Sequence, residues 1–288
     1  MNARRTFYIK SYNISGYTMQ LDEMIAFQKI IYTYYDTYCR DLPWRKTTNP
    51  YNILISEVML QQTQVDRVIE KYEKFIINFS TFHTLAQASF SDILFYWQGL
   101  GYNRRALYLQ RIAQKVVAEY QGILPRTVEE LKKFPGLGLA TASSIVVFSY
   151  NIPLVFIETN IRTVYIHYFF HGKKEIHDEE IIPFIDTTLD RKNPRKWYNA
   201  LMDYGAMLKR TEGNLSKKSA HYTKQSPFKG SNREVRGKIL RFLVTKKTIT
   251  TEELSSLFVH DGHKLHKAVD QLTGEGFIEQ TGSEIRLI

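Results

Sequence analysis

The sequence predicts an all-α domain followed by a smaller α+β domain. From about residue 50 to residue 229, apolar residues recur at helical spacing between short breaks of Gly, Pro, Asn or Ser, and no stretch shows the sustained alternation of a strand. A basic segment then interrupts this pattern. Beyond it, helical periods are followed by two short alternating stretches around a turn, which is typical of a β-hairpin.

Composition favours an intracellular globular protein with a polyanionic partner. The 288 residues are 43% hydrophobic, and 39 Lys+Arg against 29 Asp+Glu give a net charge of +10. The single cysteine, Cys39, excludes an intrachain disulfide and any cluster that needs several thiolates. Because no apolar run approaches the roughly 18 residues of a membrane span and residues 1–8 lack a signal-peptide core, we expect a cytoplasmic protein, nucleoid-associated if prokaryotic. We also expect it to be a monomer.

Four segments are predicted along the chain. Residues 1–18 have no clear period and are expected to form a loose extension. Residues 19–208 form the helical domain, whose first helix begins at Met19 and is broken by the stretch Leu42-Pro43-Trp44-Arg45. Residues 209–232 are a basic linker. Within the helical domain, the remaining periods cover residues 53–75, 90–97, 104–120, 128–133, 140–150, 160–170 and 197–208.

Residues 233–288 have the pattern of a winged-helix domain. A helix over 234–243 precedes a second helix, which Thr250 or Thr251 caps with Glu253 in capping-box style. A third helix near 263–272 leads into the hairpin. Winged helices often place the third helix in a DNA groove, but they also serve as protein-binding modules, and both possibilities stay open here.

A glycine turn at residues 134–138, Phe-Pro-Gly-Leu-Gly, opens directly onto a helix. Glycine accepts positive φ without steric cost, and the first N–H groups of the following helix have no partner inside that helix. The turn is therefore an ordinary helical corner or a phosphate-binding hairpin, and the excess of basic residues favours phosphate.

Two carboxylates could do chemistry. Glu57 is flanked by apolar residues, and burial would raise its pKa in the way that suits a general acid, unless it lies on an exposed helix face. Glu158 ends an apolar run at the mouth of the next helix, where a carboxylate can also simply complement the helix dipole. The amides of residues 61–64 (QQTQ) could fill or read a gap in a base stack, or form a polar helix face.

Five motifs together resemble the helix-hairpin-helix DNA glycosylases, and among them the adenine DNA glycosylase branch. The resemblance covers roughly residues 24–208, and its most specific stretch is SEVMLQQTQV. The motifs occur in the order LPWR at 42–45, SEVMLQQTQV at 56–65, WQGLGY at 97–102, FPGLG at 134–138 and ALMDYGAM at 200–207.

The resemblance implies a two-lobed helical fold that grips double-stranded DNA, holds phosphate at the hairpin and flips out the target nucleotide. It assigns Glu57 as the acid that protonates the leaving adenine, and Gln62 as the wedge in the vacated stack. Glu158 takes the position of the carboxylate that stabilises the sugar cation. The expected DNA contacts are Gln61, Gln62, Thr63, Tyr102, Arg104, Pro135, Gly136, Leu137, Gly138, Ala140, Lys217 and Lys218.

The chain departs from the family pattern at three places. Glu158 stands where the family has aspartate, and the extra methylene moves the carboxylate by about an ångström. Ala140 stands where bifunctional relatives have lysine, so no Schiff base can form there and strand cleavage is not expected. The four cysteines of the family's iron–sulfur cluster are missing, with Lys209, Ser216, Ser219 and a residue near Gln225 in their place, so we expect neither a cluster nor another cofactor.

The sequence therefore predicts a base excision repair enzyme that removes adenine opposite 8-oxoguanine or guanine. The alternatives are a uracil, thymine or damaged-base glycosylase on the same scaffold, and an inactive DNA-binding protein. His260, His263 and His266 fall in the third helix of the winged-helix region, where polar or phosphate contacts are expected and no metal site.

Overall fold

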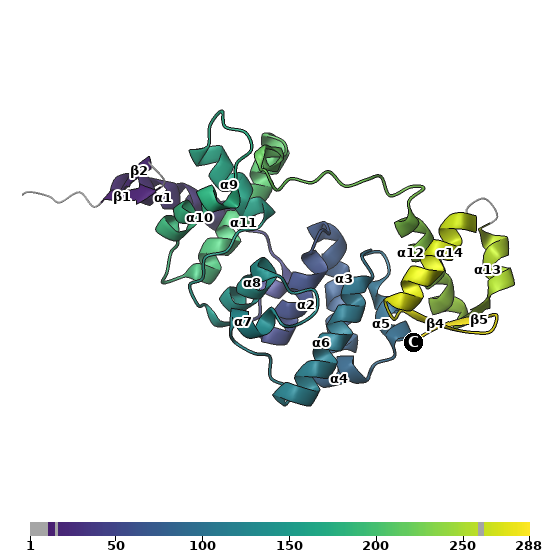
Figure 1. The fold of residues 1–288 in the computed structure, drawn as a ribbon. Helices are drawn as coiled ribbons and strands as arrows, with labels where there is room; N and C mark the ends of the chain where they lie inside the picture. The colour runs from purple at the N-terminus through teal and green to yellow at the C-terminus, as the bar shows by residue number, and fades with distance from the viewer. Residues whose placement is uncertain (1–10, 15–16, 259–261) are drawn as a thin grey trace, which may run out of the picture. The chain divides into compact units, whose positions relative to one another are not determined.

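The computed structural model describes residues 11–14, 17–258 and 262–288, and its chain divides into two compact units (Figure 1). The first unit consists of the described residues up to Thr48 together with Gly138–Lys224. The second consists of Asn49–Leu137 together with Gln225–Ile288. The chain therefore passes between the units three times, and one of these passages lies within the predicted hairpin.

The first unit is a helical body with a small β-hairpin at its start. Its helices are α1 (Leu21–Tyr38), α8 (Leu139–Tyr150), α9 (Thr159–Phe169), α10 (Asp178–Thr188) and α11 (Pro194–Thr211). Two 3₁₀ turns, η1 (Pro43–Arg45) and η2 (Leu215–Lys218), complete the unit. The strands β1 (Ser11–Ile14) and β2 (Tyr17–Gln20) pair antiparallel, with Tyr12 opposite Met19.

The core of this unit is aromatic. Phe27 of α1 packs against the rings of Tyr165, Phe169 and Trp197, with centroids 5.2–5.9 Å apart. Offset and edge-to-face aromatic pairs of this kind add stability beyond the area that they bury. They join the start of the chain to α9 and α11, which lie more than a hundred residues later.

The prediction of a loose segment over residues 1–18 is wrong for its described part. Strand β1 and the first two residues of β2 fall inside it, and Met19, where a helix was expected to begin, is instead a fully buried strand residue. Paired backbone groups stabilise these strands, and four-residue strands are too short to show a clear period in the sequence. Residues 1–10 and 15–16 lie outside the described residues.

The second unit begins with six helices of the predicted helical domain. They are α2 (Pro50–Leu60), α3 (Val65–Asn78), α4 (Phe82–Gln87), α5 (Phe90–Trp97), α6 (Arg104–Tyr120) and α7 (Val128–Leu131). The single helix expected over residues 53–75 is therefore two helices, α2 and α3, with a turn at residues 61–64. Thr81 caps α4 and Ser89 caps α5, which explains why these short helices begin where they do.

The winged-helix pattern is confirmed at the C-terminus. Its elements are α12 (Asn232–Lys246), β3 (Thr248–Thr250), α13 (Thr251–Leu257), α14 (Gly262–Gly274), β4 (Ile278–Thr281) and β5 (Glu284–Leu287). The strands form an antiparallel sheet in the order β3-β5-β4. The predicted capping box is present, because Glu253 N donates to Thr250 Oγ1 and Thr250 N donates to Glu253 Oε2, each at 3.1 Å.

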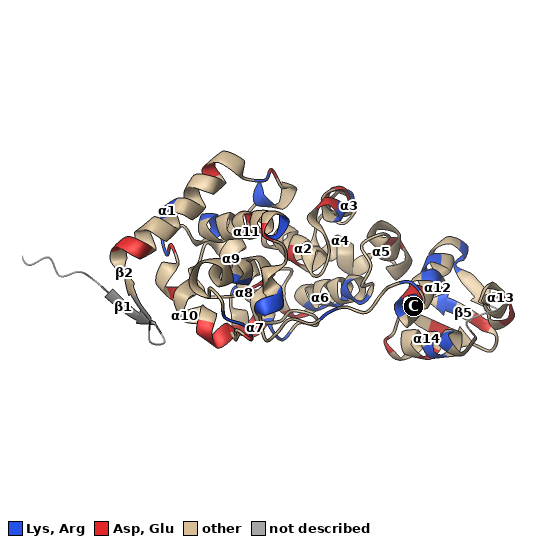
Figure 2. Cartoon of the chain, turned by 90° about the horizontal axis from the view of Figure 1, so that it is seen from above, with Lys and Arg blue, Asp and Glu red and all other residues tan. Residues whose placement is uncertain are grey.

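This domain packs on the helices of its own unit. The buried rings of Phe90 and Phe277 lie 5.6 Å apart, and Glu275 pairs with Arg104 of α6 and Arg236 of α12. Helix α12 is the more basic side of the domain (Figure 2) and carries Arg233, Arg236, Lys238, Arg241 and Lys246. Within the described part of the chain, no helix is both long enough and apolar enough to cross a membrane.

Candidate functional site

Helix α2 presents a single charged residue, Glu57, on an otherwise buried surface. Asn49 starts the helix, since its side-chain oxygen accepts from Tyr51 N at 2.9 Å, and Pro50 fixes the first turn. All but four residues of α2 are buried, whereas Glu57 is half-buried. Glu57 is therefore the only charged residue on a helix whose other residues are mostly apolar and buried.

The end of α2 is held by Arg105, a residue that the sequence did not single out. Its guanidinium donates to the carbonyls of Val58, Met59 and Gln61 at 2.9, 2.8 and 2.5 Å. It also donates to Thr63 Oγ1 at 2.9 Å and to the carbonyl of Gly101 at 3.2 Å. Burial lowers the pKa of Arg105 to about 10, which still leaves it charged at neutral pH.

These bonds explain why one expected helix became two. The last carbonyls of a helix lack internal partners, and here a buried guanidinium satisfies them in place of a further helical turn. The same side chain reaches the loop at residues 98–103. Arg105 thereby fixes two predicted DNA-contact segments, the turn at residues 61–64 and this loop, relative to each other.

Both segments carry an exposed side chain on a strained backbone. Gln62 has φ +53 and Tyr102 has φ +47, which is the left-handed region that non-glycine residues rarely adopt. Gln62 is exposed, and the Tyr102 hydroxyl accepts from the side-chain amide of Gln225. Strain of this kind persists only where the surrounding structure enforces it, and it gathers at functional sites.

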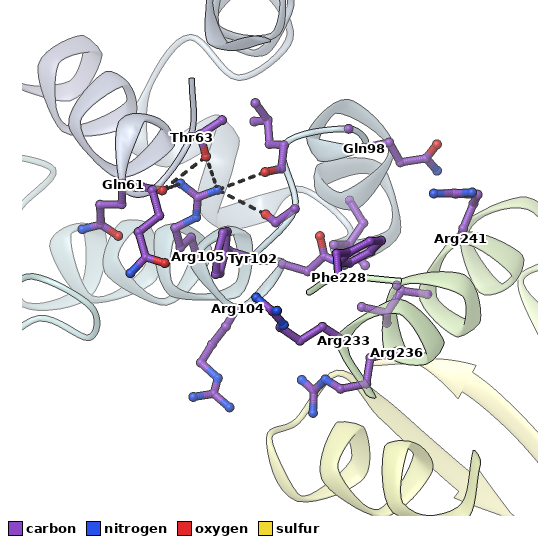
Figure 3. A pocket seen from close by; sticks show the side chains of 18 of the residues that line it. Gln61, Thr63, Gln98, Tyr102, Arg104, Arg105, Phe228, Arg233, Arg236 and Arg241 are labelled. Carbon is purple, nitrogen blue, oxygen red and sulfur yellow. Dashed lines mark hydrogen bonds between the residues drawn. The ribbon is translucent and has the colours of Figure 1, made fainter. Parts of the chain in front are cut away.

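A cavity of about 960 Å³ opens beside these segments (Figure 3). It brings together six of the predicted DNA contacts: Gln61, Gln62, Thr63, Tyr102, Arg104 and Gly136. Its far wall consists of Arg233, Arg236 and Arg241 of α12 in the winged-helix domain, together with Phe228 from the segment just before this helix. Among the described residues that line it, Glu275 is the only acidic one and six are arginines, so the cavity suits an anion.

The glycine turn is held against the same surface. Gly136 has φ +77, and a Cβ there would lie 2.5 Å from the Tyr108 ring. Its carbonyl accepts from Gln61 Nε2 at 3.1 Å, which ties the turn to the amide segment. Leu137 is only 4% exposed, so its side chain is a core contact and a DNA contact from this residue would have to use its backbone. Pro135 is half-buried beside the exposed Gly136.

Helix α8, in the first unit, begins without a side-chain cap. Its N-cap residue is Gly138, which has no side chain to offer, and Ala140 in the first turn is half-buried. The first N–H groups and the positive end of the helix dipole are then available to an anion. This local geometry agrees with the expected phosphate site, which stays a prediction.

Glu158 is the N-cap of α9. Its Oε1 accepts from the backbone N–H groups of Asn160 and Ile161 at 2.8 and 2.9 Å. Burial raises the pKa of Glu158 above its ordinary value, although these N–H groups and the charges of Arg162 and Arg40 oppose the rise. The carboxylate is therefore fixed in direction by the start of the helix.

Two sequence motifs contact each other in the same unit as this carboxylate. Asp203 of the ALMDYGAM motif accepts from the two terminal guanidinium nitrogens of Arg45 of the LPWR motif, Nη2 at 2.7 Å and Nη1 at 2.8 Å, and from Arg40 Nε at 2.6 Å. Burial alone would raise the pKa of Asp203, but Arg45 and Arg40 hold it below its usual value. Two residues further on, Gly205 brings α11 so close to α9 that a Cβ would lie 2.3 Å from the carbonyl oxygen of Asn160.

The first part of the predicted basic linker, residues 213–221, packs against its neighbours rather than forming a free linker. Ser216 and Ser219, at the expected cysteine positions, are buried, and Ser216 Oγ lies 2.9 Å from Thr163 Oγ1 of α9. Helix α11 also continues to Thr211, past the predicted boundary at residue 208. Lys217 is exposed and Lys218 is half-buried, so both are still candidates for phosphate contact. One cysteine cannot supply the four thiolates of an iron–sulfur cluster.

The two predicted carboxylates belong to different units, Glu57 to the second and Glu158 to the first. In the third helix of the winged-helix domain, His263 and His266 are exposed, and His260 lies outside the described residues.

Comparison with known proteins identifies the family. Residues 55–183 match the family described as HhH-GPD superfamily base excision DNA repair protein. The adenine DNA glycosylase of Mycolicibacterium smegmatis is 30% identical over 281 residues, covering 86% of this chain and 91% of that protein. The adenine DNA glycosylase of Buchnera aphidicola subsp. Baizongia pistaciae is 35% identical over 189 residues, covering 64% of this chain and 53% of that protein. In this second case the chain spans about half the length of its relative.

Solved structures agree on the fold. A thermostable thymine-DNA glycosylase superposes with a TM-score of 0.59 at 26% identity, covering 70% of this chain and 97% of that one. An endonuclease III–DNA complex superposes with a TM-score of 0.51 at 18% identity, which supports the fold alone. With its helical units and uncapped hairpin helix, the chain is a helix-hairpin-helix protein of the HhH-GPD superfamily. Within this superfamily it belongs to the adenine DNA glycosylase family, as the sequence motifs predicted.

Proposed function

We propose that this chain hydrolyses the N-glycosidic bond of adenine mispaired with 8-oxoguanine or guanine in double-stranded DNA. The observation that carries the proposal is the setting of Glu57. It is the one charged residue of α2, it is half-buried on a helix that is otherwise largely buried, and the exposed Gln62 follows in the next turn. An acid and a wedge on one rigid segment are what removal of a flipped base requires.

The proposed chemistry uses the two carboxyl groups in different protonation states. Glu57 gives its proton to the departing adenine, which leaves with the electron pair of the bond to the sugar carbon. Glu158 stays charged and stabilises the cationic sugar until water adds to that carbon and loses a proton. The two backbone N–H bonds and the nearby Arg162 support the charged form of Glu158 against the cost of burial.

The second unit supplies a large part of the proposed DNA-binding face. Gln62 and Tyr102 stand beside the arginine-lined cavity, so phosphate and an unstacked base could be bound within one region. Arg241 is an exposed member of the cavity wall from the winged-helix domain (Figure 3). We infer that this domain takes part in recognising the strand opposite the target base.

Base removal without strand cleavage is part of the proposal. A lyase step at the hairpin helix needs an amine that forms a Schiff base with the sugar, and the residue there is Ala140.

A duplex panel tests the substrate. The purified chain is incubated with duplexes that contain A:8-oxoG, A:G, T:G and U:G, and abasic sites are then cleaved with alkali. We expect product only from the adenine strands, and none when alkali is omitted. Thymine release would instead favour the activity named for the thymine-DNA glycosylase that shares this fold.

Two variants make the test specific to the proposed acid. Glu57→Gln keeps the shape of the side chain but removes the proton, and we expect base release to fall by about 10²–10⁴-fold with little loss of DNA affinity. Glu73→Gln, an exposed change on neighbouring α3, is the matched control and should release base at the normal rate. DNA binding without base release in the unmodified chain would refute the enzymatic proposal.

A further inference from the structure

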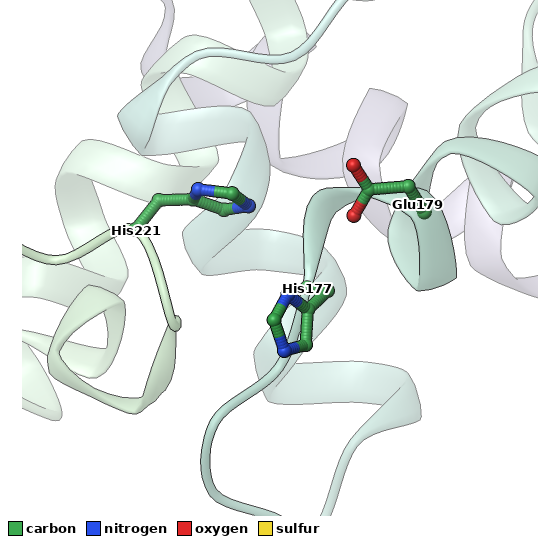
Figure 4. Close-up of side chains that lie close together, drawn as sticks. All are labelled: His177, Glu179 and His221. Atoms are coloured by element: carbon green, nitrogen blue, oxygen red, sulfur yellow. The ribbon is translucent and has the colours of Figure 1, made fainter.

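A cluster of potential metal ligands lies in the first unit, on residues that the proposed reaction does not use. It consists of His177, Glu179 and His221, whose side chains face one another (Figure 4). One ligand atom from each residue lies within 4.8 Å of the other two, and all three residues are exposed. Because His221 lies more than forty residues after the other two, the sequence did not predict this cluster.

The geometry is close to that of a metal site. Two imidazoles and a carboxylate leave a fourth position for water, which is a known ligand set for Zn²⁺. Metal–ligand bonds of about 2.0–2.2 Å place the ligand atoms of a tetrahedral site roughly 3.3 Å apart. Small side-chain rotations of exposed residues would bring the three groups to that separation.

The charges around the cluster favour a cation. Helix α10 opens with three consecutive carboxylates, of which Asp178 pairs with Arg162 at 2.6 Å and Glu180 pairs with Lys173. Glu179, between them, faces the two imidazoles (Figure 4). The positive end of the helix dipole opposes a cation at this place, but a full negative charge in the first turn outweighs partial charges of about one half.

The third ligand, His221, belongs to the segment at residues 213–221. Its backbone is attached to the stretch before α10 by two bonds, from Ile176 N to the Lys218 carbonyl and from Ala220 N to the Ile176 carbonyl, each at 3.0 Å. His221 follows directly, and its Nε2 accepts a weak bond from Asp178 N at 3.4 Å. A metal ion bound here would join the loop to the helix by coordination as well.

We propose that His177, Glu179 and His221 bind one transition-metal ion, with Zn²⁺ as the best match, and that this ion clamps the segment at residues 213–221 onto the start of α10. The ion takes a structural role in the segment where the resemblance to the glycosylase family led us to expect iron–sulfur cysteines, but it uses ligands of a different kind at different positions. The proposal does not depend on the base-release activity.

Metal titration of the 288-residue chain, without a histidine tag and stripped with a chelator, tests this directly. We expect one Co²⁺ per chain with the visible absorption of a four- or five-coordinate site, and displacement of Co²⁺ by Zn²⁺. Zn²⁺ at 100 times its Kd should raise Tm by roughly 5 °C. The double variant His177→Ala/His221→Ala should lose the Co²⁺ spectrum and the rise in Tm.

The control removes two exposed imidazoles elsewhere, in His171→Ala/His263→Ala, and should bind metal like the unmodified chain. Glu179→Gln covers the case in which the double variant does not fold, because it changes one surface side chain and should weaken Co²⁺ binding by about tenfold or more. Absence of stoichiometric binding in the unmodified chain, or unchanged binding in Glu179→Gln, would overturn the proposal.

Discussion

Replacing Gly205 with alanine is expected to disturb the proposed sugar-stabilising carboxylate without touching it. A Cβ at this position would lie 2.3 Å from the carbonyl oxygen of Asn160 and 2.7 Å from its carbonyl carbon. Ordinary contact begins near 3.4 Å, so α11 and α9 must separate by roughly 1 Å. Asn160 is two residues after Glu158 and donates to it, so the carboxylate must move with the helix start.

The magnitude follows from that displacement. Overpacking of a well-packed interface costs about 1–3 kcal/mol of folding stability. A misplacement of about 1 Å in a catalytic group can cost on the order of 10²-fold in rate. We therefore expect Gly205→Ala to lower the single-turnover rate of adenine release about 100-fold, with a measurable fall in Tm.

The assay compares single-turnover base release with affinity for a duplex that contains an abasic-site analogue. Affinity should change little, since Gly205 is not one of the expected DNA contacts and does not line the proposed DNA-binding cavity. Gly274→Ala is the matched control, because its Cβ would meet open space at the end of α14 and its φ is not left-handed. A Gly205→Ala variant with a normal rate would refute the argument that the approach of α11 to α9 positions Glu158.

Three further predictions follow from the site. Because burial raises the pKa of Glu158 above that of an unfolded glutamate, ionising this carboxyl group costs folding stability. Glu158→Gln should therefore raise Tm at pH 8, and this gain should vanish as the pH falls below the unfolded glutamate pKa of about 4.3. In the same variant, base release should fall roughly 10²–10³-fold. Arg105→Lys keeps the charge but cannot make all the hydrogen bonds of the planar guanidinium, so urea unfolding should show a free energy of unfolding lower by about 3 kcal/mol. A decrease below about 0.5 kcal/mol would contradict the role of Arg105 in holding residues 61–64. In a variant with Lys217→Gln and Lys218→Gln, the binding constant for DNA should depend less on salt. The slope of its logarithm against the logarithm of the salt concentration, measured by fluorescence anisotropy, should become shallower by about 0.9 for each phosphate that these lysines neutralise. An unchanged slope would show that these lysines do not contact DNA.

The sequence predicted what depends on local chemistry. The Thr250 capping box and the winged-helix elements are encoded within a few residues of one another, and the structure confirms both. The motif around Glu57 identified the family because its residue types are specific. The break between α2 and α3 was missed because residues 61–64 fit a helical period, and a buried arginine more than forty residues later ends the first helix.

Contacts between distant segments account for the other omissions. No sequence pattern near Gly205 predicts that a carbonyl of α9 lies against it. Similarly, no pattern near His177 predicts that His221 lies beside it. The N-terminal strands were missed for a related reason, since short strands have too few residues to show an alternation. These features arise from the packing of elements that a pattern along one stretch of chain does not describe.

The order in which the chain is made has a consequence for how the first unit forms in the cell. Helix α1 emerges from the ribosome early, but its aromatic partners on α9 and α11 follow only after the whole of residues 49–137 has been synthesised. At 5–20 residues per second, synthesis from Phe27 to the end of α11 at Thr211, 184 residues later, takes about 9–37 s. During that time the ring of Phe27 lacks its native cover, so the nascent chain offers chaperones a hydrophobic target that disappears only when α11 is complete.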